Sequence, residues 1–346
     1  MKNYVREVDK ELKKVLDRKE IYLIVPVLEK GAKSDVMNEE GNAPIHLAVL
    51  NDNLHVLKYL IEKKADLNLV NPYTKRSALM MAVQGQDEKM ANVLINAGAN
   101  LNLQDSYNET ALHVAVRYAN EPITDLLIKR GANLDIQNNK GWTALMIAIR
   151  RANKKLVSAL IENGANIHLT DKNGWSALTW AVDLGHGSFA KSLIEKGADI
   201  NIQDSKGRTP LMRAVKNDYT EAVFALLMKD ADIDVKDVYG KTAMDYAVER
   251  GFQECIKLLS LVKKREEKKA VAKEVEQDNS LEIKDVFSTE KGAVLATLSK
   301  QVPNQIFKVK TDGKKLYLTP VSLKKSEVLK KVLKDVLLFG LKREKD

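Results

Sequence analysis

The stretch Asn138–Leu169, which reads NNKGWTALMIAIRRANKKLVSALIENGANIHL, contains the pattern that decides the fold. A turn at residues 138–141 is followed by an apolar segment that Thr143 opens, and then by a second apolar segment that ends at Gly164. The apolar residues of both segments have helical spacing, which predicts two helices. Each helix has apolar surface that a lone pair cannot bury, so the unit requires neighbours of its own kind.

Copies of this unit lie on both sides of it in the chain. The position of Gly141 recurs every 33 residues, apart from one step of 34 between Gly41 and Lys75. The motif after the turn is present at 43–46 (APIH), 77–80 (SALM), 110–113 (TALH), 143–146 (TALM), 176–179 (SALT), 209–212 (TPLM) and 242–245 (TAMD). This period and its T-P-L-H-like signature resemble the ankyrin repeat. The resemblance implies a mainly α solenoid of stacked helix-turn-helix units with β-hairpin loops.

The repeats are predicted to occupy residues 38–262, in seven copies. Residues 1–37 retain the Gly-Ala ending of a repeat, but their first helix is strongly charged. A terminal repeat needs a polar outer face, so we expect a degenerate N-terminal capping repeat there. Residues 263–279 contain mixed charge and neither Pro nor Gly. They predict a charged, solvated helix that either extends the last repeat or serves as a linker.

Residues 280–346 have a different pattern, which predicts a small basic α+β module. Strand-like segments at 293–298, 305–310 and 315–319 precede an amphipathic basic segment of helical periodicity at 323–339. That helix either covers the small sheet, which we favour, or binds a membrane or a partner. Residues 263–346 contain 21 Lys and Arg against 13 Asp and Glu, a net charge of +8. Residues 1–262 contain 35 against 34, so the charge of the chain is concentrated at its C-terminal end.

Two repeats depart from the pattern in ways that predict local differences. Lys64 and Asp230 stand where the other repeats have Gly after the second helix. The chain commonly turns there through a left-handed conformation, so we expect Lys64 to be strained by roughly 1 kcal/mol. The turn at 70–75 contains the one-residue insertion and lacks the turn glycine, so we expect its hairpin to differ in shape.

No motif for catalysis, for a cofactor or for a metal is found. The sequence has no phosphate-binding glycine loop, GxSxG, HExxH or cysteine cluster, and no two histidines have ligand spacing. His46 and His113 take the last place of the recurring motif, where the resemblance implies that the ring holds the hairpin by hydrogen bonds. We therefore expect a protein that is not an enzyme and has no cofactor.

The resemblance further implies a concave face, formed by the hairpin tips and the exposed ends of the first helices, that binds other proteins. Trp142 and Trp175 hold the same position in successive repeats, so we expect their rings to be neighbours, whereas Trp180 is expected in the core. Trp, Tyr and Arg are enriched at binding hot spots. The candidate partner-binding residues are Tyr107, Glu109, Arg117, Tyr118, Lys140, Trp142, Arg150, Arg151, Asn173, Trp175, Asp183, Leu184, Lys206, Arg208, Lys216 and Asn217.

These patterns predict a non-enzymatic protein–protein interaction scaffold that binds a partner through the concave face. The alternative is an adaptor that binds nucleic acid or an anionic membrane through the basic C-terminal module. The single cysteine, Cys255, cannot form an internal disulfide, which indicates a reducing compartment. Because the N-terminus also lacks a secretory signal, we expect a monomeric cytoplasmic protein.

Overall fold

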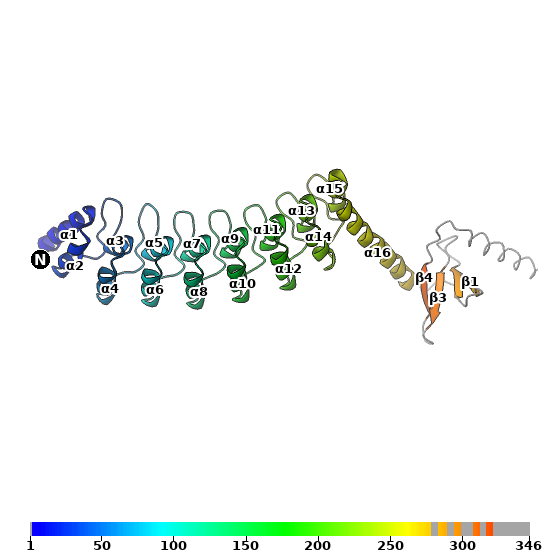
Figure 1. Cartoon of the computed structure of the whole chain (residues 1–346), viewed down its shortest axis with the longest axis horizontal. Coiled ribbons are helices and arrows are strands. Elements are labelled where there is room, and N and C mark those ends of the chain that lie inside the picture. Colours follow the sequence, from blue (N-terminus) through cyan, green and yellow to red (C-terminus); the bar gives the residue numbers. More distant parts are fainter. Residues whose placement is uncertain (1, 278–282, 289–293, 299–306, 312–315, 321–346) are drawn as a thin grey trace, which may run out of the picture. The chain divides into compact units, whose positions relative to one another are not determined.

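The chain forms two compact units, residues 1–259 and 260–346. A computed structural model describes residues 2–277, 283–288, 294–298, 307–311 and 316–320 (Figure 1). Within these residues, no helix combines the length and the apolar character that crossing a bilayer requires.

The first unit is a stack of helix pairs arranged in two rows (Figure 1). Each first helix packs against the first helix of the next repeat, and α3 to α13 also pack against their own second helices. The first helices are α3 (Pro44–Leu50), α5 (Ala78–Gln84), α7 (Ala111–Arg117), α9 (Ala144–Arg150), α11 (Ala177–Asp183), α13 (Pro210–Lys216) and α15 (Ala243–Arg250). The second helices are α4 (Leu54–Glu62), α6 (Glu88–Asn96), α8 (Glu121–Lys129), α10 (Lys154–Glu162), α12 (Gly187–Glu195), α14 (Thr220–Leu227) and α16 (Gln253–Gln277).

The stack begins with an irregular pair. It consists of α1 (Lys2–Asp17), the 3-10 turn η1 (Ile21–Leu23) and α2 (Ile24–Glu29). One face of α1 buries Leu12 and Leu16 completely, while the charged residues between them are exposed.

Polar caps and apolar cores explain why the repeats fold as they do. The hydroxyl before each of six first helices accepts the backbone N–H three residues further on, as the sequence predicted. These caps are Ser77, Thr110, Thr143, Ser176, Thr209 and Thr242. In the repeat at residues 138–169, Leu145, Leu156 and Leu160 are fully buried.

The hairpins are held by a buried Asn or Asp at the base of each turn. Its side-chain oxygen accepts backbone N–H groups of its own turn, so a loop without regular strands keeps one shape. The seven residues are Asn38, Asn71, Asp105, Asn138, Asp171, Asp204 and Asp237. Adjacent tips are also joined by backbone hydrogen bonds, for example from Lys172 N to Lys140 O (3.2 Å) and from Ser205 N to Asn173 O (2.9 Å).

Both local departures that the sequence predicted are present. Lys64 and Asp230 have φ angles of 56° and 59°, in the left-handed region. In the inserted hairpin, the bond that closes the turn runs from Asn71 N to Arg76 O, one residue further than the bond from Asn138 N to Trp142 O. The extra residue therefore widens one turn and leaves the helices in phase.

In the second unit, the described strands form one antiparallel sheet in the order β1-β2-β3-β4. The strands are β1 (Ile283–Ser288), β2 (Val294–Leu298), β3 (Phe307–Thr311) and β4 (Leu316–Pro320). The last three lie at the three strand-like segments of the sequence, whereas β1 was not predicted. Helix α16 runs without a break to Gln277, so the charged segment extends the last repeat helix. The helix expected at 323–339 lies outside the described residues.

Candidate protein-binding surface

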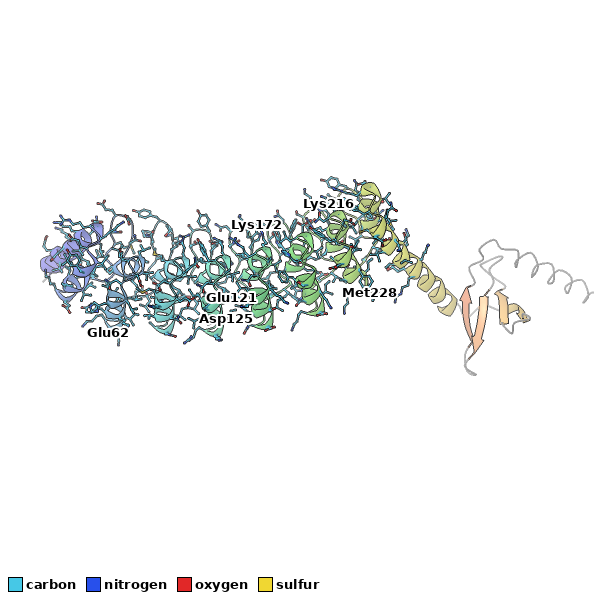
Figure 2. All side chains as sticks on the ribbon, in the orientation of Figure 1. Glu62, Glu121, Asp125, Lys172, Lys216 and Met228 are labelled. Atoms are coloured by element: carbon cyan, nitrogen blue, oxygen red, sulfur yellow. The ribbon has the colours of Figure 1, made fainter. Side chains whose placement is uncertain are left out.

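The candidate site is the hairpin face, defined as the surface formed by the hairpin tips and the C-terminal ends of the first helices in residues 105–217. Lys172 and Lys216 lie on this side of the first unit, whereas Glu62 and Asp125 lie on the side of the second helices (Figure 2). Nine of the predicted residues are exposed there: Tyr107, Tyr118, Lys140, Arg150, Arg151, Asn173, Leu184, Lys206 and Asn217. Half-buried are Arg117, Trp142, Trp175, Asp183, Arg208 and Lys216, and Glu109 is buried.

Three tryptophans meet on the hairpin face. The rings of Trp142 and Trp180 lie edge to face with centroids 5.7 Å apart, and those of Trp175 and Trp180 lie 4.5 Å apart. The two rings expected to be neighbours are therefore connected through Trp180. The prediction that Trp180 belongs to the core is wrong, because this residue is half-buried. The buried face of α11 is made by smaller side chains such as Leu178 and Val182.

A single carboxylate fixes two of these indoles. Trp142 and Trp180 each donate Nε1–H to Oδ2 of Asp171, at 3.2 Å. The other oxygen of Asp171 accepts the backbone N–H groups of Asn173 and Trp175. A buried indole N–H needs such a partner, which explains why Trp180 is turned toward the hairpin rather than into the core.

Cationic side chains lie close to the half-buried indoles. The guanidinium of Arg150 lies 3.9 Å from the ring centroid of Trp142 and 4.6 Å from that of Trp180. On the other side of the cluster, the guanidinium of Arg213 lies 3.6 Å from the centroid of Trp175. These distances are within the range of cation–π attraction. We call Arg150, Trp142, Trp180, Trp175 and Arg213 the aromatic–arginine cluster.

Arg213 is held by a network of carboxylates. It donates to Asp183 Oδ1 at 2.8 Å and pairs with Asp204, which also accepts from Arg208 Nε at 3.3 Å. Burial alone would raise the pKa of Asp204, but the backbone N–H of Arg208 and the guanidinium of Arg213 hold it below its usual range. The carboxylates thus stabilise Arg213, a charged residue, at a position that is apolar in four earlier repeats.

Trp180 and Arg213 were not among the predicted site residues, yet the sequence contains a signal for both. Each lies nine residues after the buried Asp of its hairpin and donates to that carboxylate. Tyr246 completes the series, because its hydroxyl donates to Asp237 Oδ2 at 2.5 Å. Burial is the larger cause and this hydrogen bond the next, and together they raise the pKa of Tyr246 to about 12. A hydrogen-bond donor nine residues after Asp therefore marks a side chain of the hairpin face.

The choice between Asn and Asp at the hairpin base follows the polarity of the neighbouring side chain. Asp171 faces two N–H donors, whereas Asn138 donates its own amide N–H to Glu109 Oε1 at 3.2 Å. Glu109 also pairs with Arg117 and is 5 % exposed. Of the predicted contact residues, Glu109 therefore serves to position Arg117 and offers little surface of its own.

His113 and His46 have the structural role that the sequence predicted. Nδ1 of His113 accepts the N–H of Thr110 at 3.2 Å, and its Nε2 lies 3.0 Å from Trp142 O in the next hairpin. His46 makes the same two bonds, to Ala43 N and Leu69 O, both at 3.0 Å. Burial lowers the pKa of both histidines. Each ring therefore joins the start of a first helix to the next hairpin.

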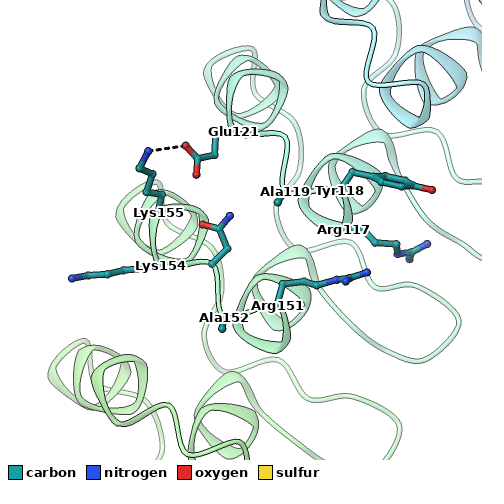
Figure 3. Close-up of a pocket in the computed structure, with 9 residues that line it drawn as sticks. Arg117, Tyr118, Ala119, Glu121, Arg151, Ala152, Lys154 and Lys155 are labelled. Carbon is teal, nitrogen blue, oxygen red and sulfur yellow. Dashed lines mark hydrogen bonds and ion pairs between the residues drawn. The ribbon is translucent and has the colours of Figure 1, made fainter.

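A shallow depression of about 770 Å³ adjoins the hairpin face between the α7–α8 and α9–α10 connections (Figure 3). The side chains of Arg117, Tyr118 and Arg151 extend together on one side, away from Lys154 and Lys155. One carboxylate, that of Glu121, lines it and pairs with Lys155 at 3.0 Å. Within the described part of the chain, no group of three or more His, Cys, Asp or Glu is placed to hold a metal ion.

Comparisons with known proteins agree with this architecture. The family described as ankyrin repeats (3 copies) matches overlapping segments that together span residues 18–270, more than half of the chain. Ankyrin repeat and SOCS box protein 16 from Homo sapiens is 32% identical over 85 residues, which are 25% of this chain and 19% of that protein. The chain thus aligns with about a fifth of that relative's length. The crystal structure of the ankyrin repeat domain of Bcl-3, a unique member of the IkappaB protein family, is similar with a TM-score of 0.57 and 28% identity. That similarity covers 64% of this chain and 100% of the Bcl-3 chain.

Proposed function

This chain belongs to the ankyrin-repeat family, and we propose that it binds a partner protein through the hairpin face, without catalysing a reaction. Ankyrin repeats are interaction scaffolds, and a repeat stack offers an extended surface rather than a closed pocket. The monomeric state and the cytoplasmic location expected from the sequence belong to the same proposal.

The aromatic–arginine cluster is the observation that supports this proposal. Hot spots of protein interfaces are enriched in Trp, Tyr and Arg, and here three tryptophans and two arginines are adjacent. The orientations of Trp142, Trp180 and Arg213 are set in advance by Asp171 and Asp204. A partner would therefore lose little side-chain freedom on binding, and such preorganisation favours affinity.

The test is affinity capture from the native cell lysate, followed by mass spectrometry. The bait is the full chain, compared with its Trp142→Ala/Trp175→Ala variant. A matched control is Phe224→Ala/Met228→Ala, which removes apolar side chains 53% and 63% exposed at the second-helix side. We expect a partner that the wild type and the control retain and that the tryptophan variant loses, while far-UV circular dichroism stays unchanged. A partner retained by all three baits would exclude the hairpin face.

The alternative function rests on the net charge of +8 in residues 263–346. An adaptor that acts through this part would capture nucleic acid or anionic lipid, and capture would fall steeply with added salt. In the same experiment, nuclease treatment and a salt series separate the two proposals. Loss of all captured material under these conditions, with no effect of the tryptophan substitutions, would favour the C-terminal unit.

A further inference from the structure

The hairpin face carries an excess of positive charge that the described residues do not neutralise. The repeats as a whole are nearly neutral, with 35 Lys and Arg against 34 Asp and Glu in residues 1–262. On the hairpin face, however, six exposed or half-buried cations form no ion pair with any described residue: Lys140, Arg150, Arg151, Lys172, Lys206 and Lys216. The near neutrality of the repeats as a whole therefore does not describe this face.

The carboxylates near these cations are already used. Asp171 and Asp204 are 5% and 7% exposed and accept hydrogen bonds from the indoles and from Arg213. Glu109 pairs with Arg117, and Asp183 pairs with Arg213. These acidic groups orient the surface, and Asp171, Asp204 and Glu109 are too buried to present much negative charge to solvent.

Arg150 is the best-positioned of the free cations. Its guanidinium lies within cation–π distance of both Trp142 and Trp180, and the residue is exposed. Cation–π contact does not use the N–H groups of a guanidinium as donors to an acceptor oxygen, so those of Arg150 can still bind a carboxylate in a bidentate manner. Arg151 follows it in the chain and extends beside Arg117 at the shallow depression (Figure 3).

The cations also disfavour one another. Burial lowers the pKa of Arg150; the carboxylate of Asp171 opposes this decrease, and the charge of Arg151 adds to it. Burial likewise lowers the pKa of Lys216, with additional contributions from Arg208, Arg250 and Arg213. An anionic ligand would relieve this repulsion, because an opposite charge within about 4–6 Å stabilises the charged form of such groups.

We propose that the ligand of the hairpin face is an acidic peptide segment, rich in Asp and Glu, whose carboxylates bind Arg150 and Arg151 beside the tryptophans. Lys140, Lys172 and Lys206 extend the positive surface along the hairpins, and Lys216 extends it at the end of α13. This inference rests on the proposed function and adds the chemical class of the partner to it.

A peptide fits this surface better than a nucleic acid does. Proteins that bind single-stranded nucleic acid offer open aromatic faces on which bases stack. Here Arg150 and Lys140 lie over Trp142, Arg213 lies over Trp175, and Trp180 is in contact with both indoles. The aromatic groups are thus engaged within the cluster, and the free groups are the N–H edges of the cations.

The test uses tryptophan fluorescence of the full chain. All three tryptophans of the protein belong to the cluster, so the signal reports on this face alone. The probes are a synthetic peptide of alternating Asp, Glu, Gly and Ser, its Asn/Gln counterpart, and a single-stranded oligonucleotide of equal charge. Anisotropy of labelled probes measures affinity independently of the tryptophans.

The variant is Arg150→Gln/Arg151→Gln, and the matched control is Lys129→Gln/Lys191→Gln, which removes the same charge from exposed positions of α8 and α12. We expect the acidic peptide to change the fluorescence and to bind the variant at least tenfold more weakly, with the control within twofold of the wild type. Affinity should fall as salt is added. The Asn/Gln peptide should not bind.

Three outcomes would overturn the inference. They are equal binding of the acidic and Asn/Gln peptides, unchanged affinity in the Arg150→Gln/Arg151→Gln variant, or tighter binding of the oligonucleotide through the same arginines. Unchanged affinity would mean that the peptide binds away from Arg150 and Arg151. If the peptide fails while Trp142→Ala/Trp175→Ala still loses a cellular partner, the proposed function stands and only the acidic class is wrong.

Discussion

At the scale of single residues, the structure is determined by positions where one backbone angle or one hydrogen bond decides the residue type. Lys64 has a positive φ of 56°, whereas the glycines at its position in other repeats adopt such angles without a steric penalty from Cβ. Asp171 connects one hairpin to two indoles. Both positions are recognisable because the repeat supplies six or more internal comparisons.

Lys64→Gly should stabilise the protein by roughly 1 kcal/mol, because it removes the left-handed strain of a residue with Cβ. The gain is reduced in part by the larger entropy of Gly in the unfolded chain. The matched reverse change is Gly131→Ala, at φ +79° with no atom within 4 Å of the added Cβ, and it should destabilise by a similar amount. Thermal melts followed by circular dichroism measure both. A lower Tm for Lys64→Gly would contradict the strain argument.

Asp171→Asn should destabilise the protein by about 1–3 kcal/mol. The two carboxylate oxygens of Asp171 accept from both indoles and from two backbone N–H groups, whereas an amide has only one acceptor oxygen. Released from Oδ2, Trp142 and Trp180 should become more exposed, so the tryptophan emission should shift to the red. Urea unfolding and emission spectra test this. Asp125→Asn, an exposed position on α8 with the same change of charge, should alter neither quantity.

At the scale of helices and hairpins, His46 and His113 predict a specific pH dependence. Burial lowers their pKa below that of the unfolded chain, so the unfolded state binds more protons. Their contribution to stability is complete above the unfolded pKa, about 6.5, and is lost as the pH falls through and below it. Urea unfolding should therefore give a lower free energy of unfolding for the wild type at pH 5.5 than at pH 7.5.

The variant His46→Met/His113→Met should lose less stability between these two pH values, since Met80 and Met146 occupy the same position in other repeats. His55→Met/His168→Met changes two exposed histidines and serves as the control. A pH dependence that is the same in all three proteins would show that the buried rings do not titrate between folded and unfolded states.

The helices of the repeats were predictable because their period, caps and turn residues recur in phase. The aromatic–arginine cluster was predictable only in part. Trp142 and Trp175 stand out as a repeated bulky residue at the hairpin tips. Trp180 instead occupies a first-helix position at which other repeats have an apolar residue, such as Leu47 or Ile147. Apolar spacing alone does not distinguish an indole that packs inward from one that donates to Asp171. The side-chain hydrogen bond decides this, and it links residues nine positions apart across a hairpin.

At the scale of the whole first unit, the larger contacts between helices link each repeat to its neighbours, and this predicts unequal responses to unfolding. Leu12→Ala removes a fully buried side chain from α1, far along the stack from the tryptophans, and should cost about 2–5 kcal/mol locally. Circular dichroism reports all the helices, while fluorescence reports only the repeats that contain Trp142, Trp175 and Trp180. We therefore expect the dichroism of this variant to decrease at lower urea concentration than its fluorescence changes.

Leu160→Ala, at a fully buried position in the central repeat, should shift both signals together. Equal shifts of both signals in Leu12→Ala would instead mean that coupling between neighbouring repeats is strong enough for the hairpin face and the N-terminal pair to unfold as one cooperative unit.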